Sequence, residues 1–325
     1  MEKRSSCPAV QRSFTNFMAS LRDIRKHIKS VKSIKQITYA MKMVAAARIR
    51  RAQNAILASR PFAEKMNELI NDLQDDMASE NFKSSPARSL FDERPDARAA
   101  GLALVTADKG LCGSFNSNLL KAAAAWLREN REKKIYVVCV GRKSRDFMRR
   151  LKGLDLEIAY EMVGIFPKAA YVHAELLAGN ILRLFERPDV AAVTLIYNEF
   201  KSLLAQRIIK SDLLPLKRHI AADGGSASLN NSFAGPRKLR DFGFEPDKTR
   251  LLETLLPRHI GAQLYRVLLE SQAAELAARM NAMGAASKNA SELIEGLTLR
   301  LNKMRQTMIT TELNEIVSGA EALGG

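Results

Sequence analysis

The residues whose types and spacing best suit chemistry follow a short apolar segment one third of the way along the chain. They form the run Asp108-Lys109-Gly110-Leu111-Cys112-Gly113-Ser114. A glycine-rich turn between a strand and a helix can present backbone N–H groups to a phosphate. The run matches neither GxxxxGK[ST] nor GxGxxG, however. Two interpretations stay open: a nucleotide site, or a strand–helix connection in which glycines permit tight turns and Ser114 or Asn116 caps the helix.

The other reactive residue types are scattered. Cys112 has no recognisable histidine partner, so a small buried thiol is a simpler interpretation than a nucleophile. The three cysteines and four histidines lie far apart and include no CxxC pair. This spacing argues against a zinc site or a disulfide framework. HExxH and GxSxG motifs are also absent. We expect no catalytic site, no cofactor and no metal.

The elements that would position this loop form an alternating pattern in the middle of the chain. Apolar runs at 102–106, 135–140, 156–159 and 190–197 predict strands, and the segments 119–130, 144–151 and 171–186 predict helices. Strands that alternate with helices indicate a small three-layer α/β domain with a mostly parallel sheet. We place this domain at residues 100–220.

A long helical arm precedes this domain. From Ala19 to Leu73 apolar residues recur mostly three or four positions apart, and no Gly or Pro interrupts them before Pro61. We expect Pro61 to kink or break the helix near Arg60. About 40 residues of helix would span roughly 60 Å, too long for a domain of ordinary size to cover. The arm needs a second long helix as its partner. The apolar positions are Leu21, Ile24, Ile28, Val31, Ile34, Met41, Val44 and Ala45.

The C-terminal arm supplies that partner. Apolar or small residues alternate at spacings of four and three from Leu269 to Met308, as in a coiled-coil seam. Gly284 and Gly296 weaken this helix locally, by up to about 1 kcal/mol each relative to Ala. The seam positions are 269, 273, 276, 280, 283, 287, 290, 294, 297, 301, 304 and 308.

The fold class is therefore two long terminal helices that form a coiled coil, with the α/β domain inserted between them. We predict the following order of segments: a disordered N-terminal tail at 1–18, a first long helix at 19–75, a charged linker at 76–99, the α/β domain at 100–220, a Gly/Ser/Asn-rich flexible loop at 221–245 and a second long helix at 246–325.

The charge of the chain points to an anionic partner. Its 325 residues include 51 Lys and Arg against 35 Asp and Glu, a formal net charge of +16. Residues 22–51 hold ten basic residues and one acid, Asp23, with Tyr39 as the single aromatic. This stretch fits a solvated helix face, a nucleic-acid-binding surface, or a shaft inside a ring of acidic loops. Composition does not decide among the three.

Three motifs do decide. The run 37–48 (ITYAMKMVAAAR) closely resembles the N-terminal helix of F-type ATP synthase gamma subunits. The run 106–116 (TADKGLCGSFN) resembles the motif of that family after the first strand of its α/β domain. The run 305–320 (RQTMITTELNEIVSGA) is similar to the C-terminal motif of the family. The resemblance covers about residues 19–323, nearly the whole chain.

The resemblance implies a central rotating shaft without a catalytic site of its own. In the family the terminal helices form a bent coiled coil inside a hexamer of alpha and beta subunits, and the α/β domain forms a foot on the membrane c-ring with the epsilon subunit. Flow of protons or sodium ions turns the shaft, which drives the catalytic beta subunits through different affinities for nucleotide. These partners include no nucleic acid, and the membrane is reached through partners.

The same resemblance assigns contacts to particular residues. Arg305, Gln306, Thr310 and Glu312 match positions that touch a loop of a beta subunit, and Met41 matches a position that faces the same region or belongs to the seam. The strand end with Tyr197, Phe200 and Lys201 matches a segment near the foot and the c-ring.

The location of the chain follows from the same comparison. No apolar run reaches the roughly 18 residues that a membrane span needs. No inserted cysteine pair of the kind found in chloroplast forms is present, so we expect no redox switch. We expect a peripheral protein on the cytoplasmic side of a bacterial plasma (inner) membrane. Residues 1–17 have three interpretations: an organelle-targeting stretch, a disordered tail, or a segment upstream of a true start at Met18.

Overall fold

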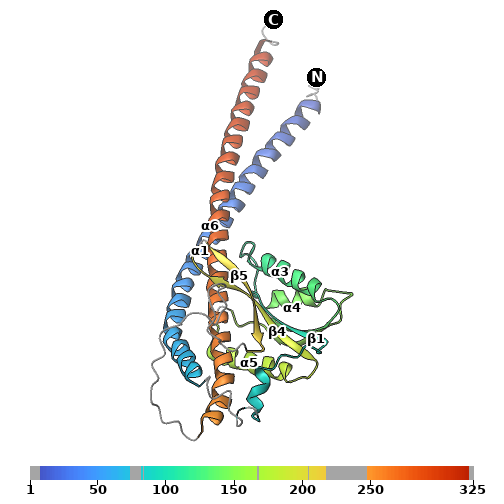
Figure 1. Ribbon diagram of the computed structural model, residues 1–325. Coiled ribbons are helices and arrows are strands. Elements are labelled where there is room, and N and C mark those ends of the chain that lie inside the picture. The colour runs from blue at the N-terminus through green and yellow to red at the C-terminus, as the bar shows by residue number, and fades with distance from the viewer. Residues whose placement is uncertain are drawn as a thin grey trace. The chain divides into compact units, whose positions relative to one another are not determined.

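The computed structural model describes residues 8–73, 82, 84–166, 168–203, 205–216 and 247–321 (Figure 1). The predicted loop at 221–245 and residues 76–81 and 83 of the predicted linker at 76–99 lie outside these residues. The elements are α1 (Pro8–Asp72), the 3-10 helix η2 (Pro86–Leu90), β1 (Ala99–Val105), α3 (Phe115–Glu129), β2 (Lys134–Val140), α4 (Arg142–Met148), β3 (Leu156–Met162), α5 (Tyr171–Phe185), β4 (Val190–Phe200), β5 (Gln206–Leu214) and α6 (Lys248–Glu321).

The chain forms two compact units. Unit 1 comprises residues up to Val44 together with those from Ala282 onward, and unit 2 comprises Ala45–Asn281. Helices α1 and α6 each contribute one segment to each unit. Each unit has its own pattern of burial, and each is described separately below.

Unit 2 is built on a five-stranded sheet of order β3-β2-β1-β4-β5. The first four of these strands are parallel neighbours, and β5 pairs antiparallel with β4. The central strand β1 is buried along its whole length, as its apolar sequence AAGLALV predicts. The sheet is therefore mostly parallel, as expected, and carries an antiparallel edge strand that the sequence analysis missed.

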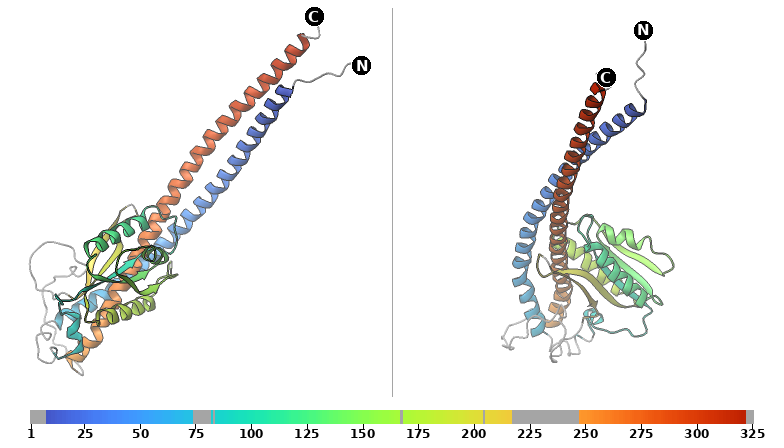
Figure 2. Two further views of the ribbon diagram at one scale, coloured as in Figure 1. Left: turned by 90° about the vertical axis from the view of Figure 1, so that its right-hand side faces the viewer. Right: turned by 90° about the horizontal axis from the view of Figure 1, so that it is seen from above.

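Alternation along the strands divides the core into two layers. Leu102 and Leu104 of β1 pack with Ile135 and Val137 of β2 against α3 and α4, whereas their sequence neighbours face α5 and α6. Successive side chains of a strand point to opposite faces, so β1 and β2 contribute to both layers. Figures 1 and 2 show the sheet between these helices. This arrangement is the predicted three-layer α/β domain, with α6 as part of one outer layer.

Helix α6 is enclosed on nearly all sides within unit 2. Large leucines such as Leu256 and Leu264 join the core cluster on the α5 side of the sheet. Further along, Ala273 and Leu276 pack with Ile49 and Ala52 of α1. The lower part of α6 therefore completes the globular core and also pairs with α1.

Unit 1 contains a single buried stripe on each helix. On α6 the inward residues include Met283, Ser287 and Ala290, and their spacing of four and three continues with half-buried residues to Met308. On α1, Leu21 and Val31 are buried. The inward positions of α6 coincide with the seam predicted from the sequence. A Met-, Ala- and Ser-containing seam gives an adaptable contact rather than a rigid zipper.

Three expectations for α1 require correction. The helix continues through Pro61 to Asp72 rather than breaking near Arg60, because Met66, Ile70 and Leu73 are packed into the core beyond the proline. Its described part begins at Pro8, so residues 8–18 are helical rather than disordered.

The third correction concerns the apolar stripe of α1. Ile34 and Val44 are each half exposed, and the inward position between them is Thr38. The Thr38 hydroxyl donates a hydrogen bond to the Ile34 carbonyl at 2.9 Å. A threonine whose hydroxyl is satisfied by its own helix can occupy a seam without a partner across it.

Candidate functional site

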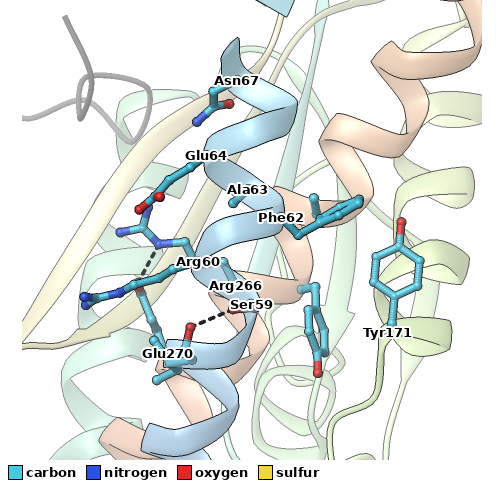
Figure 3. A pocket seen from close by; sticks show the side chains of 12 residues that line it. Ser59, Arg60, Phe62, Ala63, Glu64, Asn67, Tyr171, Arg266 and Glu270 are labelled. Atoms are coloured by element: carbon cyan, nitrogen blue, oxygen red, sulfur yellow. Dashed lines mark hydrogen bonds and ion pairs between the residues drawn. The ribbon is translucent and has the colours of Figure 1, made fainter. Parts of the chain in front are cut away.

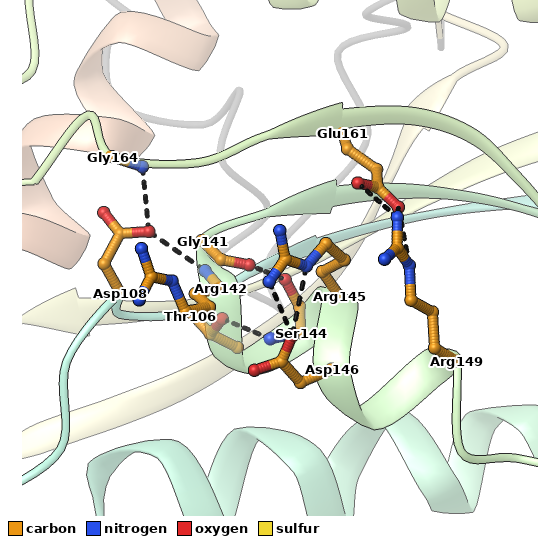
Figure 4. A network of polar contacts seen from close by, with 10 residues as sticks. All are labelled: Thr106, Asp108, Gly141, Arg142, Ser144, Arg145, Asp146, Arg149, Glu161 and Gly164. Atoms are coloured by element: carbon orange, nitrogen blue, oxygen red, sulfur yellow. Dashed lines mark hydrogen bonds and ion pairs between the residues drawn. The ribbon is translucent and has the colours of Figure 1, made fainter.

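The loop that first suggested chemistry lies at the carboxyl ends of β1, β2 and β3. The Asp108 carboxylate accepts hydrogen bonds from the backbone N–H groups of Arg142 at 3.0 Å and Gly164 at 2.9 Å (Figure 4). It also accepts one from the backbone N–H of Phe166 at 3.3 Å. These donors follow β2 and β3, so one carboxylate joins three consecutive strand ends. The oxygens of Asp108 therefore bind backbone N–H groups of the protein itself.

The rest of the loop is also satisfied internally. Asn116 accepts from the Ala107 N–H at 3.1 Å, and its amide donates to the Cys112 sulfur at 3.1 Å. Leu111 and Gly113 adopt left-handed backbone conformations, with φ of 64° and 57°. Ser114 is the N-cap residue of α3 but makes no side-chain capping bond. Asn116 therefore stabilises the turn itself, and neither residue acts as the side-chain cap that the sequence suggested.

Helix α6 packs over this end of the sheet. In open α/β sheets ligands bind in the crevice beyond the carboxyl ends of the strands, where the strand order reverses. Here Ala274 of α6 joins the core cluster that holds Leu104, Cys112 and Phe115. The buried ion pair of Glu275 with Arg279 follows on the same helix. Helix α6 therefore covers part of the region where an enzyme of this architecture would bind its substrate, while Lys109, Gly110 and Leu111 of the loop are exposed.

Cys112 is placed as a structural thiol. Its side chain is buried, and burial raises the pKa of the thiol, with a further rise from the nearby Glu275 carboxylate. A raised pKa decreases the thiolate fraction that a nucleophile needs. Among the described residues, no group of three or more His, Cys, Asp or Glu side chains could hold a metal ion.

A cavity of about 540 Å³ in unit 2 lies between α1 and α6 and includes Tyr171 of α5 in its wall (Figure 3). Aromatic side chains line one part and charged side chains the other. Arg266 donates to Glu270 at 2.7 Å, and burial raises the pKa of the Glu270 carboxyl. The lining residues are Ile56, Ser59, Arg60, Phe62, Ala63, Glu64, Asn67, Tyr171, Ala262, Tyr265, Arg266 and Glu270. The lining holds two acidic residues, Glu64 and Glu270, and two basic residues, Arg60 and Arg266. Its charge therefore favours neither an anionic nor a cationic ligand.

The three residues assigned to a membrane-ring contact have different environments. Tyr197 is fully buried, and burial raises the pKa of its phenol. The expectation that it offers a contact surface is wrong, because α6 covers this part of β4. Phe200 is half buried and packs between two core clusters, while Lys201 is exposed. The adjoining Leu203 carbonyl accepts a hydrogen bond from the Asn281 amide at 2.7 Å.

The residues assigned to a beta-subunit contact lie in unit 1. Arg305, Gln306 and Thr310 are exposed on α6, and Glu312 is half buried. The Thr310 hydroxyl donates to the Gln306 carbonyl at 3.0 Å. No ion pair is recorded for Arg305 or Glu312 in the described part of the chain. Because Leu301, Met304 and Met308 take the inward positions, Arg305, Gln306 and Thr310 face away from the seam, whereas Glu312 continues the half-buried stripe four positions after Met308.

Met41 of α1 is half buried in unit 1. It flanks the inward stripe of α1 instead of lying at its centre. Both roles suggested by the sequence, a contact with a beta subunit and a place in the seam, are compatible with this position. The basic residues of the same helix are mostly exposed. Of the ten between 22 and 51, only Lys42 is half buried.

Comparison with known proteins identifies the family. The family described as "ATP synthase" matches residues 20–323. The ATP synthase gamma chain of Elusimicrobium minutum (strain Pei191) is 47% identical over 310 residues, which cover 94% of this chain and 99% of the relative. The ATP synthase gamma chain of Anaeromyxobacter sp. (strain Fw109-5) is 42% identical over 308 residues, with 94% and 100% covered. The chain belongs to the ATP synthase gamma chain family.

Solved structures agree with this assignment. A chain from the Tetrahymena thermophila mitochondrial ATP synthase central stalk and c-ring is 25% identical, with a TM-score of 0.54 over 77% of this chain and 99% of that one. A chain from the Euglena gracilis mitochondrial ATP synthase has a TM-score of 0.60 over 94% and 95%, at 19% identity, which shows the shared fold.

Family membership explains the arrangement of the site. A gamma chain is a non-catalytic subunit of the ATP synthase, a membrane-associated complex, and forms its central stalk. The loop at Asp108 is then a structural connection, and the interaction surfaces are the functional parts. No helix in the described ranges is long and apolar enough to cross a membrane.

Proposed function

We propose that this chain couples rotation of a membrane ring to ATP synthesis through two surfaces, one on each unit. The observation that carries the proposal is the seam of unit 1, which turns Leu301, Met304 and Met308 inward and leaves Arg305 outward without an ion pair among the described residues. A shaft that works against changing partners needs outward groups that are not committed to their own helix.

The beta-subunit contact is the first surface. Arg305 can form charge-assisted, bidentate hydrogen bonds with a carboxylate on a loop of a catalytic beta subunit. Gln306, Thr310 and Glu312 lie on the same stretch of α6 and would extend this contact. Lys42 lies beside Gly284, about 30 Å along α6 from Arg305, so Met41 would meet the beta subunit at a separate point. The exposed basic residues of α1 suit a shaft that turns within a ring of acidic loops.

The ring contact is the second surface, and we place it away from Tyr197. The Lys201 segment lies beside Asn281, where α6 leaves unit 2 toward its C-terminal segment. We propose that the exposed Lys201 segment, with Phe200 beside it, contributes to the contact of unit 2 with the c-ring and the epsilon subunit.

The location follows from these partners. We propose that the chain is peripheral on the cytoplasmic face of a bacterial plasma membrane and is held there through the ring. The relatives of highest identity that we compared are bacterial gamma chains. The transported ion, proton or sodium, depends on the ring and is not specified by this chain.

Reconstitution tests the proposal. Alpha and beta subunits are assembled with and without the chain, and the stoichiometry and the rate of ATP hydrolysis are measured. One copy per complex and a marked change of rate are expected; a complex that excludes the chain would contradict the shaft assignment, and duplex DNA binding at low salt would then be measured.

The contact itself is tested with Arg305→Ala in membrane vesicles. Loss of a hydrogen bond to a charged group weakens a contact by about 1.5–3 kcal/mol, so coupled synthesis should fall while the fold stays intact. Arg300→Ala removes the same charge from another exposed position of α6. Equal synthesis by both variants and the unaltered chain would remove Arg305 from the contact.

A further inference from the structure

The segment of α6 from Gln272 to Asn281 in unit 2 buries several very small side chains. Ala273, Ala274 and Ala277 are fully buried there beside the large side chain of Leu276, whereas the preceding segment is held by leucines such as Leu264 and Leu268. Alanine has no side-chain rotamer that can interlock with a neighbour. The three alanines therefore bring the helix close to the domain but add little resistance to rotation about the helix axis.

Two polar side chains supply a directional hold on this segment. Gln272 accepts a hydrogen bond from the Ala169 N–H at 3.3 Å through Oε1, and Asn281 donates from Nδ2 to the Leu203 carbonyl at 2.7 Å. Ala169 precedes α5, and Leu203 follows β4. Nine positions separate the two side chains, which corresponds to about 180° around a helix of 3.6 residues per turn.

A third contact fixes the beginning of the helix. The Ser85 hydroxyl donates to Glu253 Oε1 at 2.7 Å, from the segment that precedes β1. The distance along α6 from Glu253 to Asn281 is roughly 40 Å at 1.5 Å per residue. These three contacts join α6 to the domain over this length, and the contacts of Gln272 and Asn281 lie on opposite sides of the helix in the alanine-rich segment.

We propose that Gln272 and Asn281 form a rotational latch, a pair of positioning residues that fix the angle of α6 in the α/β domain so that torque on the domain turns the helix. The latch rests on the proposed shaft function and identifies where the torque passes from the foot to the shaft. Both residues act through α6 and have no role in the beta-subunit contact.

The test uses the assembled, membrane-embedded complex. The double variant Gln272→Leu with Asn281→Asp removes both hydrogen bonds at nearly constant side-chain size. Thr254→Ala is the control, because the Thr254 hydroxyl bonds only to the Arg250 carbonyl of its own helix. Three quantities are measured: ATP hydrolysis without load, ATP synthesis at a fixed ion gradient, and the angular width of single rotating shafts.

The double variant should hydrolyse ATP at the unaltered rate, synthesise less ATP and show a wider angular distribution. Each lost hydrogen bond should raise the population of turned helix roughly fivefold. If the double variant matches Thr254→Ala in synthesis and angular width while the unaltered chain couples normally, the latch is wrong and the shaft function stands. If the unaltered chain fails to couple, the shaft function is wrong and the latch falls with it. If the double variant does not fold, the single variant Asn281→Asp, at an exposed contact, is compared with Thr254→Ala by the same measurements, and equal synthesis and angular width then show that the latch is wrong.

Discussion

Helix α6 is one continuous helix that meets two different environments. In unit 2 it is covered on nearly all sides and carries buried charges such as Glu270 and Glu275. In unit 1 only a narrow stripe is buried, and residues such as Leu299 and Ile316 are largely exposed. The difference teaches that the same helix acts as core in one region and as a partner surface in the other. The two regions should respond differently to comparable substitutions.

The largest expected effect concerns Gly141 in unit 2. Its φ is 92°, and a Cβ built on it would lie 2.2 Å from the Thr106 carbonyl oxygen. We expect Gly141→Ala to lower the free energy of unfolding by about 4 kcal/mol or more, measured by urea denaturation. Gly153→Ala is the control, because Gly153 also has a positive φ but open space around it; its cost should be about 1–2 kcal/mol. Equal losses would show that strain, rather than the overlap, dominates.

The next comparison uses two leucines of α6. Leu264→Ala should cost about 2–5 kcal/mol, because Leu264 is fully buried in the core of unit 2. Leu301→Ala should cost about 1 kcal/mol or less, because Leu301 is half buried in the seam of unit 1. Denaturant unfolding followed by circular dichroism measures both. If Leu301→Ala lowered the free energy of unfolding more than Leu264→Ala does, the distinction between the core of unit 2 and the partner surface of unit 1 would be wrong.

The third prediction concerns His259 of unit 2. Burial lowers the pKa of its imidazole from 6.5 to about 4. The folded state therefore keeps His259 neutral while the unfolded state takes up a proton below about pH 6.5. Stability should fall as the pH decreases from 6.5 to 4, by about 2 kcal/mol at pH 5. The variant His259→Gln should lose this part of the pH dependence; an unchanged slope in unfolding experiments between pH 7 and 5 would assign it to other groups.

The smallest effect has the opposite sign and belongs to unit 1. A Cβ on Gly284 would meet Lys42 Cδ at 3.7 Å, an ordinary contact. Gly284→Ala should therefore stabilise the helix by about 0.5–1 kcal/mol, which amide hydrogen exchange of nearby residues can detect. Gly296→Ala, in open space, serves as the matched variant. A loss at Gly284 together with a gain at Gly296 would mean that the two helices approach more closely there.

Much of this fold could be predicted because its periodicity is strong. The seam from Met283 to Met308 and the four parallel strands follow from spacing and apolar runs. Strand β5 was missed because Gln206–Leu214 is an edge strand with only weak alternation, IIKSDLL interrupted by charge. The continuation of α1 through Pro61 depends on Met66 and Ile70 packing into a core assembled from distant segments, which local sequence cannot show.

Some residues of the site could be placed from the sequence, and others could not. The outward position of Arg305 follows from the seam, since its neighbours at 301, 304 and 308 are the apolar ones. The burial of Tyr197 could not be predicted, because it depends on coverage of β4 by a helix that begins some 50 residues later. The same is true of Asn116, whose amide stabilises the Asp108 loop through contacts that only the folded turn creates. Gln272 and Asn281 carry no sequence signal that marks them as contacts.

The coverage of the sheet by α6 has a consequence for biosynthesis. The apolar face formed by β1, β2 and β4 is completed by residues from Leu252 onward, which are translated last. A nascent chain that already contains all five strands must keep that face exposed until α6 leaves the ribosome. Exposed apolar surface of this kind makes an incomplete chain prone to aggregation and a substrate for chaperones. A gamma chain interrupted before α6 should therefore be removed by quality control instead of entering the complex as a defective rotor.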